Sequence, residues 1–251
     1  PASGHLACGD NGAGKMPEAE TLYEYIYRDT AYEKDLTGKK ILVTAGPTRE
    51  TIDPVRFISN RSTGKMGFAL AKNAMERGAD VTLVSGPVEL KDVPFVKMVH
   101  VESARQMFEA VTKEAETADI IVKAAAVADY RPAVVADEKI KKKDGDMSIA
   151  LERTDDIIGT LGKTKRDNLF LCGFSMETEH MLENSKAKLE KKNLDMIIAN
   201  NVKVKGAGFG TDTNVVTLIT KDEIKELPIM SKEDVADEIF NNILANRKGI
   251  V

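Results

Sequence analysis

The polar side chains best suited to chemistry lie in one loop, between the apolar run 41–44 and a stretch typical of a helix. Its side-chain donors are Arg49, Arg56, Asn60 and Arg61. Arginine binds phosphate or carboxylate through paired N–H groups, and an asparagine amide both donates and accepts hydrogen bonds. The loop therefore predicts a site for an anionic ligand. The alternative is that these residues cap loop carbonyls and pair with Glu50 and Asp53.

This loop matches neither of the two common phosphate-binding fingerprints. A dinucleotide-binding loop reads Gly-x-Gly-x-x-Gly, but here Gly46 is followed by Pro47 and Thr48. A Walker A loop would need glycine at Ser59 and a hydroxyl at Met66. We therefore expect a phosphorylated ligand that is bound in a less common way.

A second candidate is the alanine-rich segment 124–131, which follows an apolar run. Small side chains let a flat ring approach the backbone closely, and Asp129 could then bond the ring or a ribose. Tight packing of a helix on a sheet, with Asp129 as a cap, explains the same residues equally well.

Lysines cluster in two further places. Lys139 to Lys143 precede Asp144-Gly145, a strong hairpin signal. Such lysines usually protect a solvated edge, but on a mobile hairpin they could close over an anionic substrate. Lys188 and Lys192 share one face of a predicted helix, which is either simply solvated or placed to meet a polyphosphate.

The composition excludes several classes of protein. The chain has 251 residues, 30% of them charged, and a formal net charge of −4, which argues against a nucleic-acid partner. No apolar run is long enough for a membrane helix, and no signal peptide is visible. Two cysteines, Cys8 and Cys172, give no disulfide framework and indicate a reducing, cytoplasmic setting. The three histidines have no metal-ligand spacing.

The elements that must position these residues alternate from Leu36 onward, which predicts a mainly parallel, Rossmann-like α/β sheet with helices on both faces. The expected parallel strands are 40–44, 81–85, 120–124, 169–174 and 196–199. The expected helices begin at Ser62 or Thr63, at a capping box of Ser103 and Gln106, near Glu179, and at Ser231 with Asp234. Runs 215–220 and 224–229 predict an antiparallel extension.

Residues 1–35 differ in texture from the rest, and we interpret them as a flexible, glycine-rich tail and linker before a domain at 36–251. Gly9 to Met16 only superficially resembles a P-loop, because no strand precedes it and no hydroxyl follows Lys15. The chain does not begin with Met, so we expect processing or a longer parent protein.

Four motifs, in order and correctly spaced, resemble phosphopantothenoylcysteine synthetase: 44–50, 53–67, Ala-Ala-Val-Ala-Asp-Tyr at 125–130 and Lys-Ile-Lys-Lys at 139–142. The resemblance runs from about Leu36 to the C-terminus. The tail 4–16 is similar to the end of the flavin-dependent decarboxylase that is fused ahead of this synthetase in many bacteria, where the cysteine matching Cys8 is a proton donor. Nearly all of that domain is missing, so FMN binding is not expected.

The resemblance implies a reaction and roles for residues. The carboxylate of 4′-phosphopantothenate attacks CTP, with Mg²⁺, to give an acyl-cytidylate and pyrophosphate, and the amine of L-cysteine then displaces CMP. Asn60 would contact the acyl-cytidylate, with Arg56 nearby, and Lys139 would lie on a flap that closes over it. The resemblance assigns the cytidine pocket and the triphosphate contacts to Ala124, Ala125, Asp129, Thr154, Asp155, Asp156, Ile157, Phe174, Lys188 and Lys192.

One motif departs from the family pattern. The family often has Asn-Pro-Asp-Ile where this chain has Thr154-Asp155-Asp156-Ile157. Loss of the proline is expected to free this turn, and Asp155 adds a carboxylate beside a triphosphate.

Two other functions remain as alternatives. An NAD(P)-dependent oxidoreductase would share the strand–loop–helix start, but Val84-Ser85-Gly86 lacks the acidic residue that holds a ribose. A regulatory subunit would keep the fold without catalysis. The resemblance also implies a homodimer with part of the site completed across the interface, and a higher oligomer in the fused protein.

Overall fold

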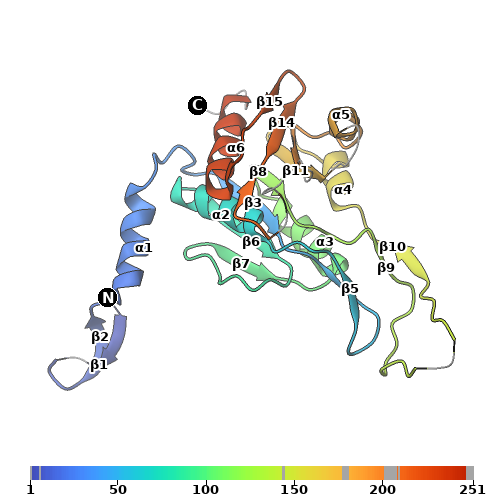
Figure 1. Cartoon of the computed structure of the whole chain (residues 1–251). Helices are drawn as coiled ribbons and strands as arrows, with labels where there is room; N and C mark the ends of the chain where they lie inside the picture. The colour runs from blue at the N-terminus through green and yellow to red at the C-terminus, as the bar shows by residue number, and fades with distance from the viewer. Residues whose placement is uncertain are drawn as a thin grey trace.

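A computed structural model describes residues 2–5, 7–142, 145–176, 181–200, 208 and 210–246. Its centre is an eight-stranded sheet in the order β15-β14-β12-β11-β8-β3-β6-β7 (Figure 1). The six strands from β12 to β7 run parallel. Their bounds are β3 Lys40–Ala45, β6 Asp80–Ser85, β7 Lys97–His100, β8 Ile120–Lys123, β11 Phe170–Met176 and β12 Met196–Asn200. The predicted α/β fold is confirmed, and of these six parallel strands only β7 was not expected.

The antiparallel extension is confirmed as well. β14 (Val216–Thr220) pairs with β12, and β15 (Ile224–Glu226) pairs with β14, both antiparallel. All five residues of β14 are buried, because β12 and β15 flank this strand and helices cover the faces of the sheet. A small antiparallel pair, β13 (Thr213–Asn214) and β16 (Met230–Ser231), leads into the last helix.

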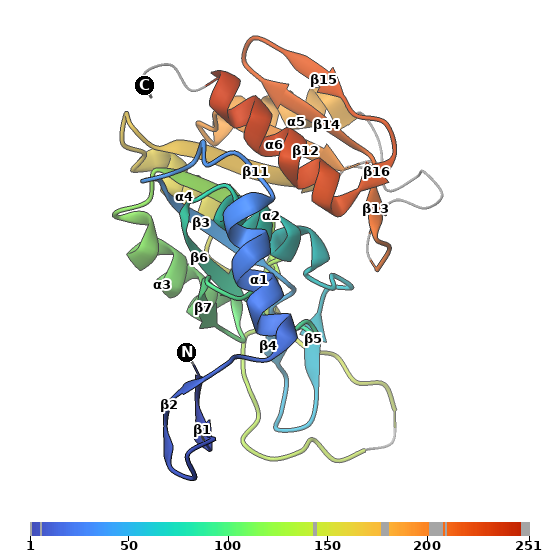
Figure 2. The ribbon, with the colours of Figure 1, turned by 90° about the vertical axis from the view of Figure 1, so that its left-hand side faces the viewer.

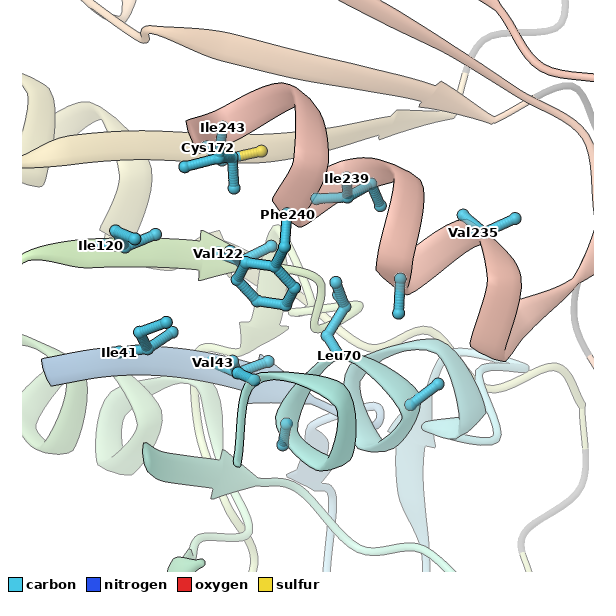
Figure 3. Close-up of a cluster of buried hydrophobic side chains, with 14 of the residues drawn as sticks. Ile41, Val43, Leu70, Ile120, Val122, Cys172, Val235, Ile239, Phe240 and Ile243 are labelled. Atoms are coloured by element: carbon cyan, nitrogen blue, oxygen red, sulfur yellow. The ribbon is translucent and has the colours of Figure 1, made fainter. Parts of the chain in front are cut away.

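Helices cover both faces of the sheet and enclose two apolar cores. α2 (Lys65–Glu76) and α6 (Lys232–Asn246) pack on one face. α3 (Ala104–Ala115), α4 (Ile157–Lys163) and α5 (Met181–Lys191) pack on the other. Figure 3 shows Phe240 of α6 reaching between Leu70 of α2 and Val43 and Val122 of the sheet. Phe240 is fully buried, so the two helices and the central strands form one packed unit.

The helix starts follow their predicted signals in two of three described cases. Ser103 and Gln106 form the expected capping box, and Ser231 Oγ accepts the N–H of Asp234 at 3.0 Å. The prediction that Ser62 or Thr63 caps α2 is wrong. Gly64 stands at the N-cap with φ of 79° and no side-chain cap, a left-handed conformation that glycine adopts at little cost. The predicted start near Glu179 lies outside the described residues.

The N-terminal segment is more structured than the flexible tail expected from its glycines. β1 (Ala2–His5) and β2 (Asn11–Lys15) form an antiparallel hairpin, and α1 (Ala19–Thr30) follows. α1 buries none of its residues; it touches the body through Tyr25, whose ring centroid is 4.6 Å from that of Phe95. In Figure 2 this helix lies in front of α2, whereas the hairpin stands clear of the sheet. No helix of the described residues is long and apolar enough to cross a membrane.

Two slender extensions leave the sheet edge (Figure 1). One is the hairpin of β4 (Arg49–Thr51) and β5 (Phe57–Ser59). The other, which we call the arm, is formed by the described residues 130–142 and 145–153, with β9 (Tyr130–Pro132) paired to β10 (Leu151–Arg153) at its base. The predicted hairpin around Asp144-Gly145 shows no strand at 139–142, and the ladder of the arm lies at its base instead. Lys143 and Asp144 lie outside the described residues.

Candidate functional site

The site lies where the chain reverses its direction through the sheet. After β3 the chain builds β6 and β7 on one side, and then returns to place β8, β11 and β12 on the other. β3 and β8 are therefore neighbours whose following loops diverge. Open α/β sheets bind ligands at this switch point, at the carboxyl ends of the strands. The loop with Asn60 and the alanine segment follow these two strands.

Hydrogen bonds join the loop after β3 to the segment after β8. Ala126 N donates to Gly46 O at 2.9 Å, and Thr48 N donates to Ala126 O at 3.3 Å. The buried hydroxyls of Thr44 and Thr48 accept the N–H groups of Ala125 and Ala128 at 3.1 and 3.0 Å. These two threonines were not among the predicted site residues, although they fix the alanine segment in place.

Asn60 lies at this junction. Its Nδ2 donates to Ala126 O at 3.0 Å, which leaves the amide oxygen to accept a bond from a ligand. The structure thus brings Asn60 beside the alanine segment.

One hollow, the alanine hollow, opens against the start of α2 and has a volume of about 150 Å³. It is lined by Ser62 to Gly67, Ala124 to Ala126, Phe174 to Met176, Asn200, Gly208, Asn214 and Lys232. The unpaired N–H groups of a helix start favour an anion. Asn200 Oδ1 is buried here without a partner among the described residues, so a ligand donor would satisfy it.

Gly67 lets α2 lie close to β3 beside this hollow. A Cβ at Gly67 would stand 2.5 Å from Ala45 Cβ and 2.8 Å from Thr44 O, which is closer than atoms tolerate. Only glycine fits, so the start of α2 is held against the end of the strand.

A second hollow, the lysine hollow, lies on the other side of the alanine segment and measures about 330 Å³. It is lined by Lys123, Val127 to Tyr130, Arg153 to Ile157 and Lys192. This size lies within the range of small-molecule sites. The predicted cytidine-pocket residues are therefore divided: Ala124, Ala125 and Phe174 line the first hollow, and Asp129 and the 154–157 turn line the second.

Lys123 is a site residue that the sequence analysis missed. Burial lowers its pKa to about 8; Asp129 opposes this effect, and the charges of Lys192 and Lys188 add to it. Three lysine charges near one hollow repel one another, and an anion bound among them would relieve this cost. The signal in the sequence was a lysine that ends the otherwise apolar strand Ile-Ile-Val-Lys.

The 154–157 turn is fixed despite the missing proline. Thr154 Oγ1 donates to Ala128 O at 2.6 Å, and Thr154 N donates to Asp129 O at 3.0 Å. Asp156 caps α4 by accepting Gly159 N at 3.0 Å and also pairs with Lys192. These bonds attach the turn to the alanine segment and to Lys192, whereas greater freedom of the turn without the proline stays a prediction.

Arg56 and Lys139 lie apart from the hollows. Arg56 pairs with Asp53, as the alternative interpretation of the loop anticipated. Lys139 is an exposed residue of the arm. Neither Arg56 nor Lys139 is among the described residues that line the two hollows. The structure therefore gathers the predicted site residues into a group at the sheet edge and a pair on the extensions.

This geometry defines an α/β domain with an anion-receptive site at the switch point of its sheet. The sequence profile of the DNA/pantothenate metabolism flavoprotein C-terminal domain matches residues 36–246. The chain belongs to this family.

Individual relatives are consistent with this membership. The Coenzyme A biosynthesis bifunctional protein CoaBC of Bacillus subtilis (strain 168) is 49% identical over 253 residues, with 99% of this chain and 62% of the relative covered. The chain thus spans about three fifths of the length of that relative. A crystal structure of the C-terminal domain of a CoaBC protein is 47% identical, with a TM-score of 0.71 and 83% of this chain and 95% of that one covered.

A more distant structure shows the fold alone. It is a Cab2 mutant, H337A, in complex with phosphopantothenate-cysteine, with 16% identity, a TM-score of 0.68, and 93% of this chain and 96% of that one covered.

Proposed function

We propose that this domain is a ligase of coenzyme A biosynthesis that joins 4′-phosphopantothenate to L-cysteine, using CTP. Support comes from the family, from the names of its relatives, and above all from the switch-point site, where a helix start and a lysine-lined hollow flank the alanine segment. Two anion-receptive hollows on either side of one segment suit a reaction that must hold a nucleoside triphosphate and a phosphorylated acid together.

The chemistry assigned to these residues starts from a carboxylate, which acylates an amine poorly until it carries a good leaving group. The carboxylate oxygen of phosphopantothenate bonds to the α-phosphorus of CTP and pyrophosphate leaves. The amine of cysteine then forms the amide and CMP leaves. Asn60 orients the acyl-cytidylate, with Arg56 nearby on the same loop, and the charge of Lys139 offsets that of the transferring phosphate. Lys123, Lys188 and Lys192 are the proposed contacts of the triphosphate.

The lining of the lysine hollow offers carboxylates for Mg²⁺, but too few to hold the ion without a ligand. Asp129 and Asp155 bring carboxylates to its lining, but within the described residues no cluster of three or more metal-ligating side chains occurs. Mg²⁺ usually takes one or two carboxylates and completes its shell with phosphate oxygens and water. It would therefore enter with the triphosphate and neutralise charge there.

A homodimer is part of the proposal, and the exposed apolar residues of the extensions support it. They are Val55, Phe57, Tyr130, Val134, Val135, Met147 and Leu151. Their exposed fractions range from 46% for Tyr130 to 81% for Val134. Exposed apolar side chains gathered on the extensions suit an interaction site, and a second copy would cover them while bringing Arg56 and Lys139 to a site. Sedimentation over a range of concentrations tests this; a monomer at micromolar concentration would contradict it.

The N-terminal segment 1–35 is proposed to be the end of a decarboxylase domain, to which FMN binding would belong. This rests on the sequence resemblance of residues 4–16 around Cys8.

The deciding experiment measures pyrophosphate release from CTP and Mg²⁺ with phosphopantothenate, with and without L-cysteine. Release that needs both CTP and phosphopantothenate, with multiple turnovers only when cysteine is present, supports the ligase and its two half-reactions. ATP in place of CTP tests the preference for the base. Folded protein that releases no pyrophosphate in any arm would contradict the proposal.

A further inference from the structure

The carboxylate of Asp53 is buried at the turn between β4 and β5, and four groups donate to it. Its Oδ1 accepts the N–H groups of Val55 and Arg56, both at 2.9 Å. Its Oδ2 accepts Arg56 Nε at 3.0 Å and the N–H of Ile140 at 3.1 Å. The side chain of Asp53 has no exposed surface. A carboxylate with this many donors serves more than the turn itself.

Arg56 completes the contact from the other side. Its Nη2 donates to the carbonyl of Ile140 at 3.0 Å, while the same guanidinium pairs with Asp53. Both polar backbone groups of Ile140 are therefore held by one ion pair. We call this arrangement, made by Asp53, Arg56 and Ile140, the bracket.

The bracket attaches the arm to the β4–β5 turn directly beside Lys139. Ile140 directly follows Lys139, and a further bond from Ala136 N to Ile52 O at 3.0 Å docks the same part of the arm on the β4–β5 turn. Lys139 lies between these two attachments. The direction in which its flexible side chain leaves the backbone is thus set by the turn.

The charge state of the bracket is stable. The hydrogen bond from Arg56 holds the pKa of Asp53 well below its usual range. The carboxylate is therefore ionised near neutral pH, where protonation does not release the bracket.

We propose that Asp53 is a positioning residue: with Arg56 it brackets the backbone of Ile140 and so fixes the point on the arm from which Lys139 reaches the reacting groups. This rests on the role proposed above for Lys139. Asp53 touches no reacting atom, and its effect on the reaction passes through Lys139 alone.

The first test is independent of activity and uses Asp53→Asn. Asparagine keeps the shape and one acceptor oxygen for the turn, but it loses the charge and the acceptor that serves Ile140 and Arg56. Hydrogen exchange at the Ile140 amide is expected to become roughly 10- to 100-fold faster. Asp92→Asn is the matched control, because Asp92 is exposed and contacts only His100 in the described structure. Unchanged exchange at Ile140 in folded Asp53→Asn would overturn the bracket.

A second variant covers the case in which Asp53→Asn fails to fold. Arg56→Lys keeps the positive charge but lacks the planar fork that reaches both Asp53 and the Ile140 carbonyl. A smaller acceleration at the Ile140 amide is expected. No acceleration in this variant would contradict the bracket on its own.

The second test asks whether Asp53 acts through Lys139. Acyl-cytidylate formation is measured in wild type, Asp53→Asn, Lys139→Gln and the double variant. Asp53→Asn is expected to lower kcat about tenfold with KM for CTP unchanged, and to add nothing in the Lys139→Gln background. An equal loss in both backgrounds would show another route for Asp53. Wild-type protein without turnover would refute the ligase, whereas the exchange result would still decide the bracket.

Discussion

At the sheet edge, buried threonine hydroxyls and backbone groups join the loops after β3 and β8, whereas the arm carries exposed apolar residues and is docked at Ala136 and Ile140. Substitutions at the sheet edge should therefore reduce stability and ligand binding together. Substitutions on the arm should reduce catalysis and leave stability unchanged. The comparison separates residues that build the site from residues that are brought to it.

The largest effect is expected for Lys139→Gln, which removes the charge of the arm. Acyl-cytidylate formation should fall on the order of 10²- to 10³-fold, the usual cost of losing a group that stabilises developing charge. The urea midpoint should not move, because the side chain is exposed. Lys142→Gln, an exposed neighbour on the same arm, is the control. Normal turnover by Lys139→Gln would show that the arm does not serve the reaction.

A smaller effect, on both stability and CTP binding, is expected for Thr48→Val at the sheet edge. The buried N–H of Ala128 would lose its acceptor, at a cost of about 1–3 kcal/mol in the free energy of unfolding. CTP should also bind more weakly, because the segment that separates the two hollows would shift. Thr164→Val, which removes an exposed hydroxyl bond, should change stability by no more than about 0.5 kcal/mol. If Thr48→Val lowered stability without weakening CTP binding, the expected link between stability and ligand binding at the sheet edge would be wrong.

The pKa of Lys123 predicts that stability and CTP affinity change in opposite directions with pH. Its pKa is about 8 in the folded chain and near 10.5 when unfolded, so between these values the unfolded chain holds the extra proton. Stability contributed by this group therefore rises with pH across that window. CTP affinity should change in the opposite direction, falling several-fold above about pH 8, because the neutral amine no longer attracts phosphate. Urea unfolding and CTP titration at several pH values test this, and both trends should be absent in Lys123→Met.

The smallest effect is expected for Ser103→Ala, outside both regions. Loss of the capping box of α3 should cost about 1 kcal/mol of unfolding free energy, with CTP binding and turnover unchanged. Thermal unfolding and the pyrophosphate assay measure the two quantities. A loss of activity here would mean that stability anywhere in the sheet limits the reaction.

Much of the fold could be predicted because buried parallel strands have continuous apolar runs, as in Ile-Leu-Val at 41–43 and Ile-Ile-Val at 120–122. The start of α2 was mispredicted because Gly64 adopts its conformation through tertiary packing, which a capping pattern does not reveal. Short polar strands such as Arg49–Thr51 and Tyr130–Pro132 have no such signal, since they exist only through their partners.

The site was predicted unevenly for related reasons. Asn60 lies in the loop after β3 and the alanine segment follows β8, and the pairing of these strands brings the two segments into contact. Lys123 was overlooked because it continues an apolar strand, and its importance comes from its burial and from the charges of Lys188 and Lys192, which are distant in the sequence. Asp53 was considered only as a partner of loop arginines, since its bond to Ile140 joins residues that are 87 positions apart.

The adjacency of β3 and β8 also governs when the site can form during folding. The backbone N–H of Lys40, at the start of β3, donates to the carboxylate of Asp119, which is 79 positions later in the sequence. The segment with β6, β7 and α3 lies between these two residues in the sequence. Pairing at such a separation closes a long loop at a cost in chain entropy, and contacts of this kind slow folding. A nascent chain that has emerged only as far as β7 can pair three strands, but it has no switch point. Binding competence is therefore acquired late, in the step that seats β8 beside β3.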